Sequence, residues 1–367
     1  MAFKQSPHMN PGEGEASYAR NSAVQKTVQE SMKTLIEEAV TGLFTTRNSY
    51  LVKNMVIADL GCSSGPNALT LVSAAIDAIH HHCVQQAKLP PKISVFLNDL
   101  PNTDFNTVAK SLATLKHSHE DFSYPIVITG IIPGSFYERL FACGSLHLVC
   151  SSNSIQWLSK APDYLKESKT PMYDSDESLR LSRRQTVRDA YAQQFREDFT
   201  LFLNLRAQEM VSRGRMVVSL YVRCSDKPDF EFTQPWIPVM VALSDMALRD
   251  MINKEKFDSF HLPLYCPLDH EVNKIIEDEG SFEINRTLMH DPYGVMDKAL
   301  INPRMMALWT RAAFEPLIVQ HFGSSKEFMD EFMRTLELHL TSWGMEAVLS
   351  SEYPLAFMCL SLIRATY

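Results

Sequence analysis

The segment from Met55 to Ile76 constrains the fold more than any other part of the chain. It opens with the apolar run Met55-Val-Ile-Ala-Asp59, which ends in an acid and is followed at once by Gly61 and Gly65. Apolar residues then return with helical spacing through Ile76. A strand that enters a glycine turn and a helix is the building unit of open α/β sheets, whose ligands bind outside the carboxyl ends of the strands. The segment therefore predicts an α/β fold with a ligand site at this turn.

The spacing of the glycines narrows the class of ligand. Residues 59–65 read D-x-G-x-x-x-G, which lacks the third glycine of the G-x-G-x-x-G pattern found at dinucleotide sites. NAD-dependent oxidoreduction is disfavoured for that reason. The turn suits an adenosyl group that carries little negative charge, such as S-adenosyl-L-methionine.

Composition excludes several other classes of protein. The 367 residues are 45% hydrophobic, enough for a large core, and their formal net charge is −8. No long basic run is present, so neither nucleic acid nor an anionic membrane is an expected partner. The seven cysteines form no C-x-x-C pair, which favours reduced thiols. Because the polar N-terminus also lacks an apolar signal core, we expect a cytoplasmic protein.

Strand-like and helical segments alternate along the chain, which predicts a mostly parallel sheet with helices on both faces. Expected strands cover 56–60, 93–97, 126–132, 146–151 and 216–222, with two late strands at 281–284 and 355–363; expected helices cover 22–43, 235–253 and 302–322. The polar stretch 162–184 is expected to be a mobile surface connection. We expect four parts, namely an N-terminal arm or lid at 1–20, an α/β core at 21–223, a helical cap insertion at 224–325 and a return to the core sheet at 326–367.

Three later strand ends carry further candidate site residues. Asp99 ends the second strand, where it suits ribose hydroxyls, an amine or a sulfonium, although it also suits a turn cap before Pro101. Ser135 can bind a ligand or cap a helix, and Phe136 beside it can stack on an adenine ring. Gln156-Trp157 follows another strand and offers an amide and a flat apolar wall to a small planar or carboxylated substrate, although Trp157 also suits a core position.

These motifs together resemble the plant SABATH methyltransferases, which include the salicylate, benzoate, jasmonate and caffeine-forming enzymes. The similarity begins at Met9-Asn-Pro-Gly-Glu-Gly-Glu-Ala-Ser-Tyr-Ala-Arg-Asn-Ser22 and Gln25. It continues through A-D-L-G-C-S-S-G-P-N, N-D-L-P-N-T-D-F-N, P-G-S-F-Y and S-I-Q-W-L-S-K-A-P, and then through Arg206-Ala-Gln-Glu209, Gly214-Arg-Met-Val217, Glu315-Pro-Leu and His321-Phe-Gly. The resemblance implies a Rossmann-like class I methyltransferase sheet with a mostly helical cap over the active site. It also implies a homodimer that methylates a small carboxylic acid.

The resemblance assigns site residues by position. For the cofactor S-adenosyl-L-methionine it implies Tyr18, Ser22, Asp59, Gly61, Cys62, Asn67, Asp99, Leu100, Ser135 and Phe136, with Cys150 and Ser151 close by. Gln25 and Trp157 are the implied catalytic residues, which orient the acceptor carboxylate without acting as a general base. The rest of the substrate pocket is implied to comprise Asn153, Gln156, Trp236, Thr310, Ala313 and Leu355.

Departures from the family pattern leave the acceptor open. Asn153, Gln156 and Thr310 make the expected pocket more polar than that of a salicylate enzyme, and benzenoid acids, cinnamate, indole-3-acetate, jasmonate and farnesoate all stay open. N-methylation of a xanthine is the alternative, because Gln also occupies position 156 in xanthine-methylating relatives. A ligand sensor without catalytic activity is a lesser alternative. Some relatives hold Mg²⁺ near a D-x-F-N segment; Asp258 and Phe260 match it, but His261 and Ser168 do not.

Overall fold

The segment from Met55 to Ile76 forms the centre of a seven-stranded sheet. A computed structural model describes residues 8–45, 53–115, 124–223, 236–323, 325–344 and 356–366. The strand β1 (Asn54–Leu60) leads through the 3-10 turn Pro66–Leu69 into α2 (Thr70–Gln85). Successive side chains of a strand point to opposite faces, so Ile57 enters one hydrophobic cluster and Ala58 the other. Burial on both faces explains why β1 reads as a continuous apolar run.

The order of the strands is β3-β2-β1-β4-β5-β7-β6. Strands β1 to β5 are parallel, and β7 pairs antiparallel with both β5 and β6. The other strands span β2 (Lys92–Asp99), β3 (Val127–Pro133), β4 (Leu146–Ser152), β5 (Met210–Val222), β6 (Phe282–His290) and β7 (Ala356–Arg364). Each expected strand is present, which confirms the predicted α/β sheet. The carboxyl ends of β1, β2, β3 and β4 therefore lie along one edge, where the sequence predicts the ligand.

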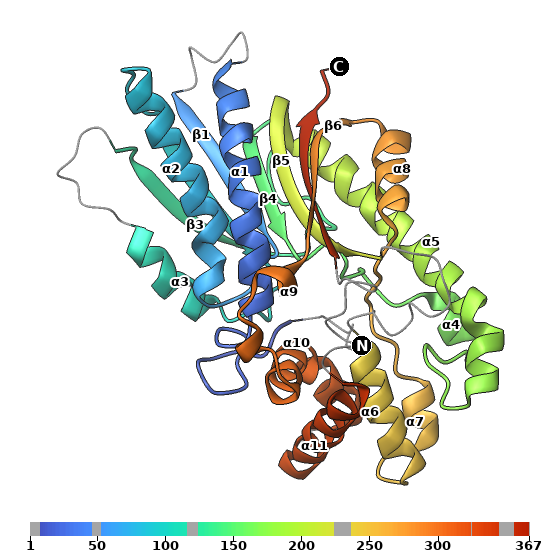
Figure 1. Cartoon of the computed structure of the whole chain (residues 1–367). Coiled ribbons are helices and arrows are strands. Elements are labelled where there is room, and N and C mark those ends of the chain that lie inside the picture. Colours follow the sequence, from blue (N-terminus) through green and yellow to red (C-terminus); the bar gives the residue numbers. More distant parts are fainter. Residues whose placement is uncertain are drawn as a thin grey trace.

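Helices cover both faces of the sheet (Figure 1). On one face α1 (Ala23–Thr45) packs beside α2, because its apolar stripe from Val24 to Val40 is buried there. On the other face α5 (Glu177–Glu209) buries Phe195, Phe199 and Phe202 and packs beside α8. The remaining helices are α3 (Phe105–Leu112), α4 (Asp163–Glu167), α6 (Ile237–Leu248), α7 (Lys254–Asp258), α8 (Asp269–Glu279), α9 (Pro292–Val295), α10 (Pro303–Phe322) and α11 (Lys326–Trp343). None of the described helices is long and apolar enough to cross a membrane.

A cluster of helices lies beyond one end of the sheet. In Figure 1, α6, α7, α10 and α11 gather there, and α11 packs against both α6 and α10. This grouping does not follow the expected boundaries. The strand β6 falls within 224–325 but pairs with β7, and α11 falls within 326–367 but belongs to the helical cluster. The sheet accepts β6 because it is an edge strand, which exposes a mostly polar face and needs little apolar sequence.

The stretch 162–184 is more ordered than its polarity indicated. It contains α4 and the first turns of α5, so many of these surface residues are helical rather than an irregular connection. Asp176 caps α5 by accepting a hydrogen bond from the Leu179 N–H at 3.0 Å. Arginines rather than apolar residues occupy the inner face of the first turns, which hid the helical pattern in the sequence.

Candidate active site

The turn after β1 requires glycine for steric reasons. Gly61 has φ of 76°, and a Cβ added there would lie 2.3 Å from the Ser154 Oγ. Gly65 has φ of 99°, and its Cβ would lie 2.8 Å from Ala19 of the N-terminal arm. Positive φ is unfavourable for residues with a Cβ, and the close neighbours leave no room for one. The N-terminal arm and the segment that follows β4 therefore both lie close against this turn.

Backbone and carboxylate hydrogen bonds join the ends of three strands beside this turn. The Gly61 and Cys62 N–H groups donate to the Asn98 carbonyl at 2.9 and 3.0 Å. The Asn98 amide donates to the carbonyls of Ile132 and Gly134 at 2.8 and 2.9 Å. Asp99 accepts from the Ser63 N–H at 2.5 Å and from the Leu100 N–H at 2.7 Å. Asp99 therefore caps the turn, as one interpretation of the sequence proposed, and fixes the shape of the predicted ligand site.

Asp59 is a buried carboxylate with an unused oxygen. Its side chain is 2% exposed, and its Oδ1 has no hydrogen-bond partner among the described residues. Burial, and then the nearby charge of Asp99, raises the pKa of Asp59 to about 8. Burial also raises the pKa of Asp99. A buried acceptor is unfavourable unless a donor reaches it, so this carboxyl fits a ligand with hydroxyl donors or positive charge.

The raised pKa predicts that proton release accompanies cofactor binding. Below about pH 8 the free protein holds Asp59 protonated, and a bound cation with hydroxyl donors favours the ionised form. Affinity for S-adenosyl-L-methionine should then rise with pH up to about 8 and level off above it. Calorimetric titration at pH 7 in two buffers of different ionisation enthalpy measures the released protons. Asp59→Asn should release fewer protons than the wild type, and equal release by both proteins would contradict the assignment.

Other expected cofactor residues surround the two carboxyls. Burial, and then the charge of Asp99, raises the pKa values of Tyr18 and Cys62, which lie near that carboxylate. The Asn67 amide donates to both the carbonyl and the Oγ of Ser22 at 2.9 Å, which ties the arm to the turn. Both side chains are buried. The structure thus brings residues from two separate segments, the arm and the turn, to the same end of β1.

Ser135 and Phe136 follow β3, and a buried ion pair that sequence reasoning did not assign supports their loop. The Phe136 ring lies near Gly61, since a Cβ at Gly61 would be 3.5 Å from the ring. Arg206 donates to the carbonyls of Phe136 and Glu138 at 2.9 and 3.0 Å. Glu209 accepts from the N–H groups of residues 140 and 141 at 2.7 and 3.1 Å, and its Oε2 lies 2.8 Å from the Arg206 Nε. The i, i+3 spacing of Arg206 and Glu209 was the available signal.

Cys150 and Ser151 lie on β4, beside Asp59 in the register of the sheet. Both side chains are fully buried, and the Ser151 hydroxyl donates to the Leu60 carbonyl at 2.8 Å. Burial, and then the charge of Asp59, raises the pKa of the Cys150 thiol. These contacts hold β1 in place, so Cys150 and Ser151 support the site from within the sheet.

The segment after β4, which carries Asn153, Gln156 and Trp157, forms a second wall of the candidate site. Asn153 adopts φ of 57°, which turns the chain sharply, and its N–H donates to the Ser219 carbonyl at 3.0 Å. The Gln156 amide donates to the Asn153 carbonyl at 2.8 Å. A carbonyl can only accept, so this bond fixes the amide orientation and leaves the Gln156 Oε1 buried without a partner among the described residues. The wall therefore offers an acceptor to a ligand.

Trp157 is half-buried and its backbone is held on three sides. Its N–H donates to the Ser154 carbonyl at 3.0 Å, its carbonyl accepts from the Tyr137 hydroxyl at 2.8 Å, and it forms a β-bridge with Leu264. Its ring lies 5.6 Å from the ring of Phe314 on α10. Trp157 is therefore packed against the core without being fully buried, and its ring lies between the sheet and the helical cluster.

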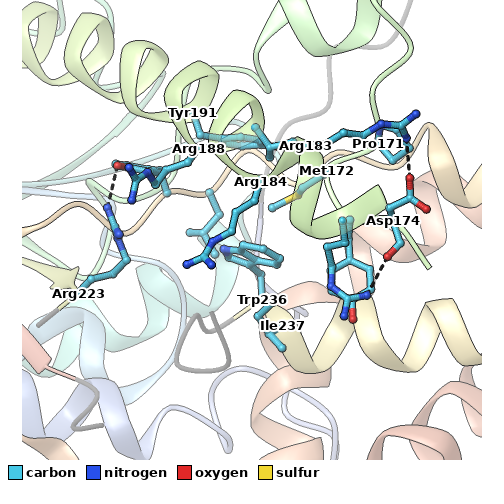
Figure 2. Close-up of a pocket in the computed structure, with 15 residues that line it drawn as sticks. Pro171, Met172, Asp174, Arg183, Arg184, Arg188, Tyr191, Arg223, Trp236 and Ile237 are labelled. Atoms are coloured by element: carbon cyan, nitrogen blue, oxygen red, sulfur yellow. Dashed lines mark hydrogen bonds and ion pairs between the residues drawn. The ribbon is translucent and has the colours of Figure 1, made fainter. Parts of the chain in front are cut away.

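The remaining expected substrate residues come from α1 and the helical cluster. Gln25 is half-buried in the first turn of α1. Thr310 and Ala313 share one face of α10 with Phe314, but the Thr310 hydroxyl donates within its own helix, to the Met306 carbonyl at 2.9 Å. Trp236 precedes α6 and lines a cavity with Leu264 and Tyr265, as Figure 2 shows in part. Leu355 lies outside the described residues.

The turn also matches a spacing used for nucleophilic serine. Gly61-x-Ser63-x-Gly65 has the spacing of the nucleophile elbow of α/β hydrolases, and Ser63 has a φ of 54°. The serine of such an elbow is hydrogen-bonded to a histidine. The buried Ser63 Oγ has no hydrogen-bond partner among the described residues, and its backbone N–H is used to fix Asp99. The turn therefore supports ligand binding rather than a serine nucleophile.

The residues that match the magnesium pattern do not fit a cation site. The carboxylate of Asp258 lies 2.7 Å from the Lys254 ammonium, and Phe260 is fully buried against His321 and Phe322. The His261 ring nitrogens lie 3.0 and 2.9 Å from the carbonyls of Ser259 and Thr170. Within the described part of the chain, no three His, Cys, Asp or Glu side chains gather as metal ligands.

The family model for SAM-dependent carboxyl methyltransferases matches residues 4–365. The chain belongs to this family, the SABATH methyltransferases. It is 37% identical over 355 residues to a probable jasmonic acid carboxyl methyltransferase of Theobroma cacao, covering 92% of this chain and 94% of that one. It is 36% identical over 350 residues to a probable 7-methylxanthine methyltransferase of Camellia ptilophylla, covering 94% of each. The chain is an S-adenosyl-L-methionine-dependent carboxyl methyltransferase.

A solved structure supports the same fold and cofactor. The methyltransferase resembles loganic acid methyltransferase with S-adenosylhomocysteine, with a TM-score of 0.83 and 28% identity over 98% of this chain and 99% of that chain. The sheet is thus the class I methyltransferase sheet, and the cofactor is S-adenosyl-L-methionine. The narrow glycine turn, the free oxygen of Asp59 and the nearby Phe136 fit an adenosyl group that bears a positive sulfonium.

Proposed function

We propose that this methyltransferase esterifies the carboxylate of a small plant acid and that Gln25 and Trp157 orient this acceptor. We also propose that its cofactor is held by Tyr18, Ser22, Asp59, Asn67, Asp99, Ser135 and Phe136. When bound, S-adenosyl-L-methionine supplies a methyl group on a positively charged sulfur. A carboxylic acid with a pKa of about 4 is already ionised at neutral pH, so the acceptor needs no general base. The protein must align it and exclude water, and alignment supplies roughly 7–11 kcal/mol in favourable cases.

The placement of Trp157 is the observation that carries this proposal. Three backbone contacts and the packing against Phe314 hold its indole between the sheet and the helical cluster. The indole N–H can only donate a hydrogen bond, which suits a carboxylate oxygen. Asn153 and Gln156, on the same wall, carry amides that do not titrate near neutral pH. This set of groups orients an anion without moving a proton.

N-methylation of a xanthine is the second candidate, and one observation favours it. The buried Oε1 of Gln156 is an acceptor that its surroundings leave unused among the described residues. An N–H group of a xanthine would satisfy it, whereas a carboxylate has no donor to offer. Such an acceptor must lose a proton during the reaction, and the amides at positions 153 and 156 cannot accept one.

Transfer of labelled methyl groups to a panel of acids and xanthines tests the two candidates. We expect label in methyl esters, and Trp157→Phe should lower kcat/KM by about 10²-fold, the typical loss when one positioned donor is removed. Its affinity for S-adenosylhomocysteine should stay close to that of the wild type. Trp343→Phe, at the half-buried end of α11, is the matched control and should keep full activity.

The outcomes of the panel separate the candidates. Label in xanthines alone would reject the carboxyl acceptor, and no label in any acceptor would favour a ligand sensor. Equal loss of activity and of S-adenosylhomocysteine binding in Trp157→Phe would show that Trp157 acts mainly in packing. From the family resemblance we also propose a cytoplasmic homodimer in which α6, α7, α10 and α11 cap the site. Light scattering measures its oligomeric state.

A further inference from the structure

The proline inside α10 leaves one buried carbonyl group without a donor from its own helix. In an α-helix each carbonyl accepts a hydrogen bond from the N–H of the residue four positions later. For Ala312 that residue is Pro316, which has no N–H. Ala312 is fully buried, and a buried carbonyl that accepts no hydrogen bond is unfavourable. At this position α10 therefore needs a donor from another part of the chain.

Asn10 of the N-terminal arm supplies that donor. Its backbone N–H donates to the Ala312 carbonyl at 2.8 Å, and its side-chain amide donates to the Glu315 carboxylate at 2.5 Å. Arg311 holds this carboxylate through two hydrogen bonds of 2.9 Å each. The Glu315 side chain is 16% exposed, so the contact is largely shielded from water. The arm is thus joined to α10 through groups that the helix itself holds in place.

The same arm is attached to the proposed cofactor site. The Asn10 carbonyl accepts from the Tyr18 N–H at 2.9 Å, and the Asn10 amide also donates to the Ala16 carbonyl at 2.9 Å. Further along the arm, Ser22 accepts from the Asn67 amide in the turn after β1. Because hydrogen bonds join Asn10 directly to Tyr18, the position of the arm at the cofactor turn and its position at α10 depend on each other.

The helix α10 carries residues of the proposed acceptor site close to these contacts. Thr310 and Ala313, which the family resemblance assigns to the substrate pocket, lie within two residues of Ala312. The ring of Phe314 lies 5.6 Å from the ring of Trp157. The helix itself packs against α6 and α11, in the helical cluster beyond the end of the sheet (Figure 1). The arm therefore connects the helix of the acceptor site to the cofactor end of the sheet.

We propose that Asn10 and Glu315 are positioning residues that couple the two ligands. Bound cofactor fixes the arm, and the arm fixes α10 in the position that the acceptor requires. This inference rests on the proposed cofactor contacts of Tyr18 and Ser22 and on the proposed acceptor site. Cofactor and acceptor should each raise the affinity for the other, because coupling between two binding sites is reciprocal.

Hydrogen–deuterium exchange of the α10 amides, with and without saturating S-adenosylhomocysteine, tests the coupling. We expect S-adenosylhomocysteine to slow exchange across residues 303–322 of the wild type by about tenfold, within the usual range for coupling between sites. Asn10→Asp should abolish this protection. Aspartate has nearly the size of asparagine, but its ionised carboxylate donates no hydrogen bond and would face the carboxylate of Glu315.

Asn302→Asp is the matched control, because it makes the same substitution at the start of the same helix. The Asn302 side chain accepts from the Met305 N–H at 3.0 Å, and aspartate caps a helix equally well. This variant should keep the full protection by S-adenosylhomocysteine. Thermal unfolding of each variant checks that it is folded.

Two further variants distinguish coupling from a loss of packing. Adding Glu315→Gln to Asn10→Asp places an amide donor opposite the new carboxylate and should restore much of the protection. Pro316→Ala gives the Ala312 carbonyl a donor within α10 and should weaken the protection while the arm keeps all its side chains. Protection that stays lost in the double variant, or is unchanged in Pro316→Ala, would contradict the roles given to Glu315 and to the Ala312 carbonyl.

Methyl transfer to the acid that gives most product in the panel measures the effect on the reaction. Asn10→Asp should raise the KM for this acid by about tenfold and change kcat less, because the reacting groups are intact. Equal protection of α10 in the wild type and in Asn10→Asp, or no protection in the wild type, would overturn the inference. Both results are obtained with S-adenosylhomocysteine alone, so they stand apart from the question of whether any acid is methylated.

Discussion

Replacing Glu209 by alanine is expected to lower the free energy of unfolding by about 3–5 kcal/mol, because it leaves a buried arginine without its partner. Arg206 and Glu209 both have fully buried side chains and lie 2.8 Å apart. Burial lowers the pKa of Arg206, and the charge of Glu209 acts in the opposite direction. Total stability of a folded domain is roughly 5–15 kcal/mol, so this loss is a large part of it.

The same change should loosen the loop that carries Ser135 and Phe136. Glu209 accepts two backbone N–H groups of that loop, and Arg206 donates to two of its carbonyls. Affinity for S-adenosylhomocysteine should therefore fall as well. Urea unfolding and calorimetric titration measure the two effects.

Glu197→Ala is the matched control, since Glu197 is exposed on the same helix and accepts from Gln193 at 2.9 Å. A double variant, Arg206→Met with Glu209→Leu, leaves no unpaired buried charge and should recover part of the stability, although the backbone groups of the loop still lose their partners. It should not recover cofactor affinity, because the loop would still lack its hydrogen bonds. Losses of similar size in Glu209→Ala and Glu197→Ala would show that the buried pair contributes little.

Replacing Gly61 by alanine is expected to abolish tight cofactor binding. The left-handed backbone at φ of 76° costs roughly 1–2 kcal/mol for a residue with a Cβ. The new methyl group would also lie 2.3 Å from the Ser154 Oγ and 2.6 Å from its Cβ, so the turn or the wall after β4 must move. Overpacking of this kind costs about 1–3 kcal/mol. Either movement changes the distance between the turn and Phe136.

Gly144→Ala separates the two contributions. Gly144 also has positive φ, of 60°, but nothing lies within 4 Å of an added Cβ. This variant should show the backbone strain alone and should bind S-adenosylhomocysteine like the wild type. Calorimetric titration and thermal unfolding of both variants measure the difference. Cofactor affinity in Gly61→Ala equal to that in Gly144→Ala would mean that the turn does not form the cofactor site.

Most of the sheet could be predicted because its signals are local. The central parallel strands β1 and β4 are buried on both faces, so each reads as an apolar run that needs no knowledge of its neighbours. The positions of Asp59 and Asp99 at strand ends followed from these runs. The first turns of α5 were missed because arginines replace the apolar stripe by which a helix is recognised. The grouping of α11 with α6 and α10 could not be predicted, because it depends on contacts between distant segments.

The site, like the fold, depends partly on local sequence patterns and partly on contacts between distant segments. The turn from Asp59 to Gly65 is a local pattern, and by itself it indicated an adenosyl cofactor with little negative charge. The sequence motifs by themselves also identified the methyltransferase family. Only the tertiary structure placed Arg206 under Phe136, 70 residues away, and left the oxygen of Gln156 without a partner among the described residues. It alone joined Asn10 of the arm to Ala312 and Glu315 of α10. The physical reason is that acceptor choice depends on side chains from several elements, and packing determines which of them meet.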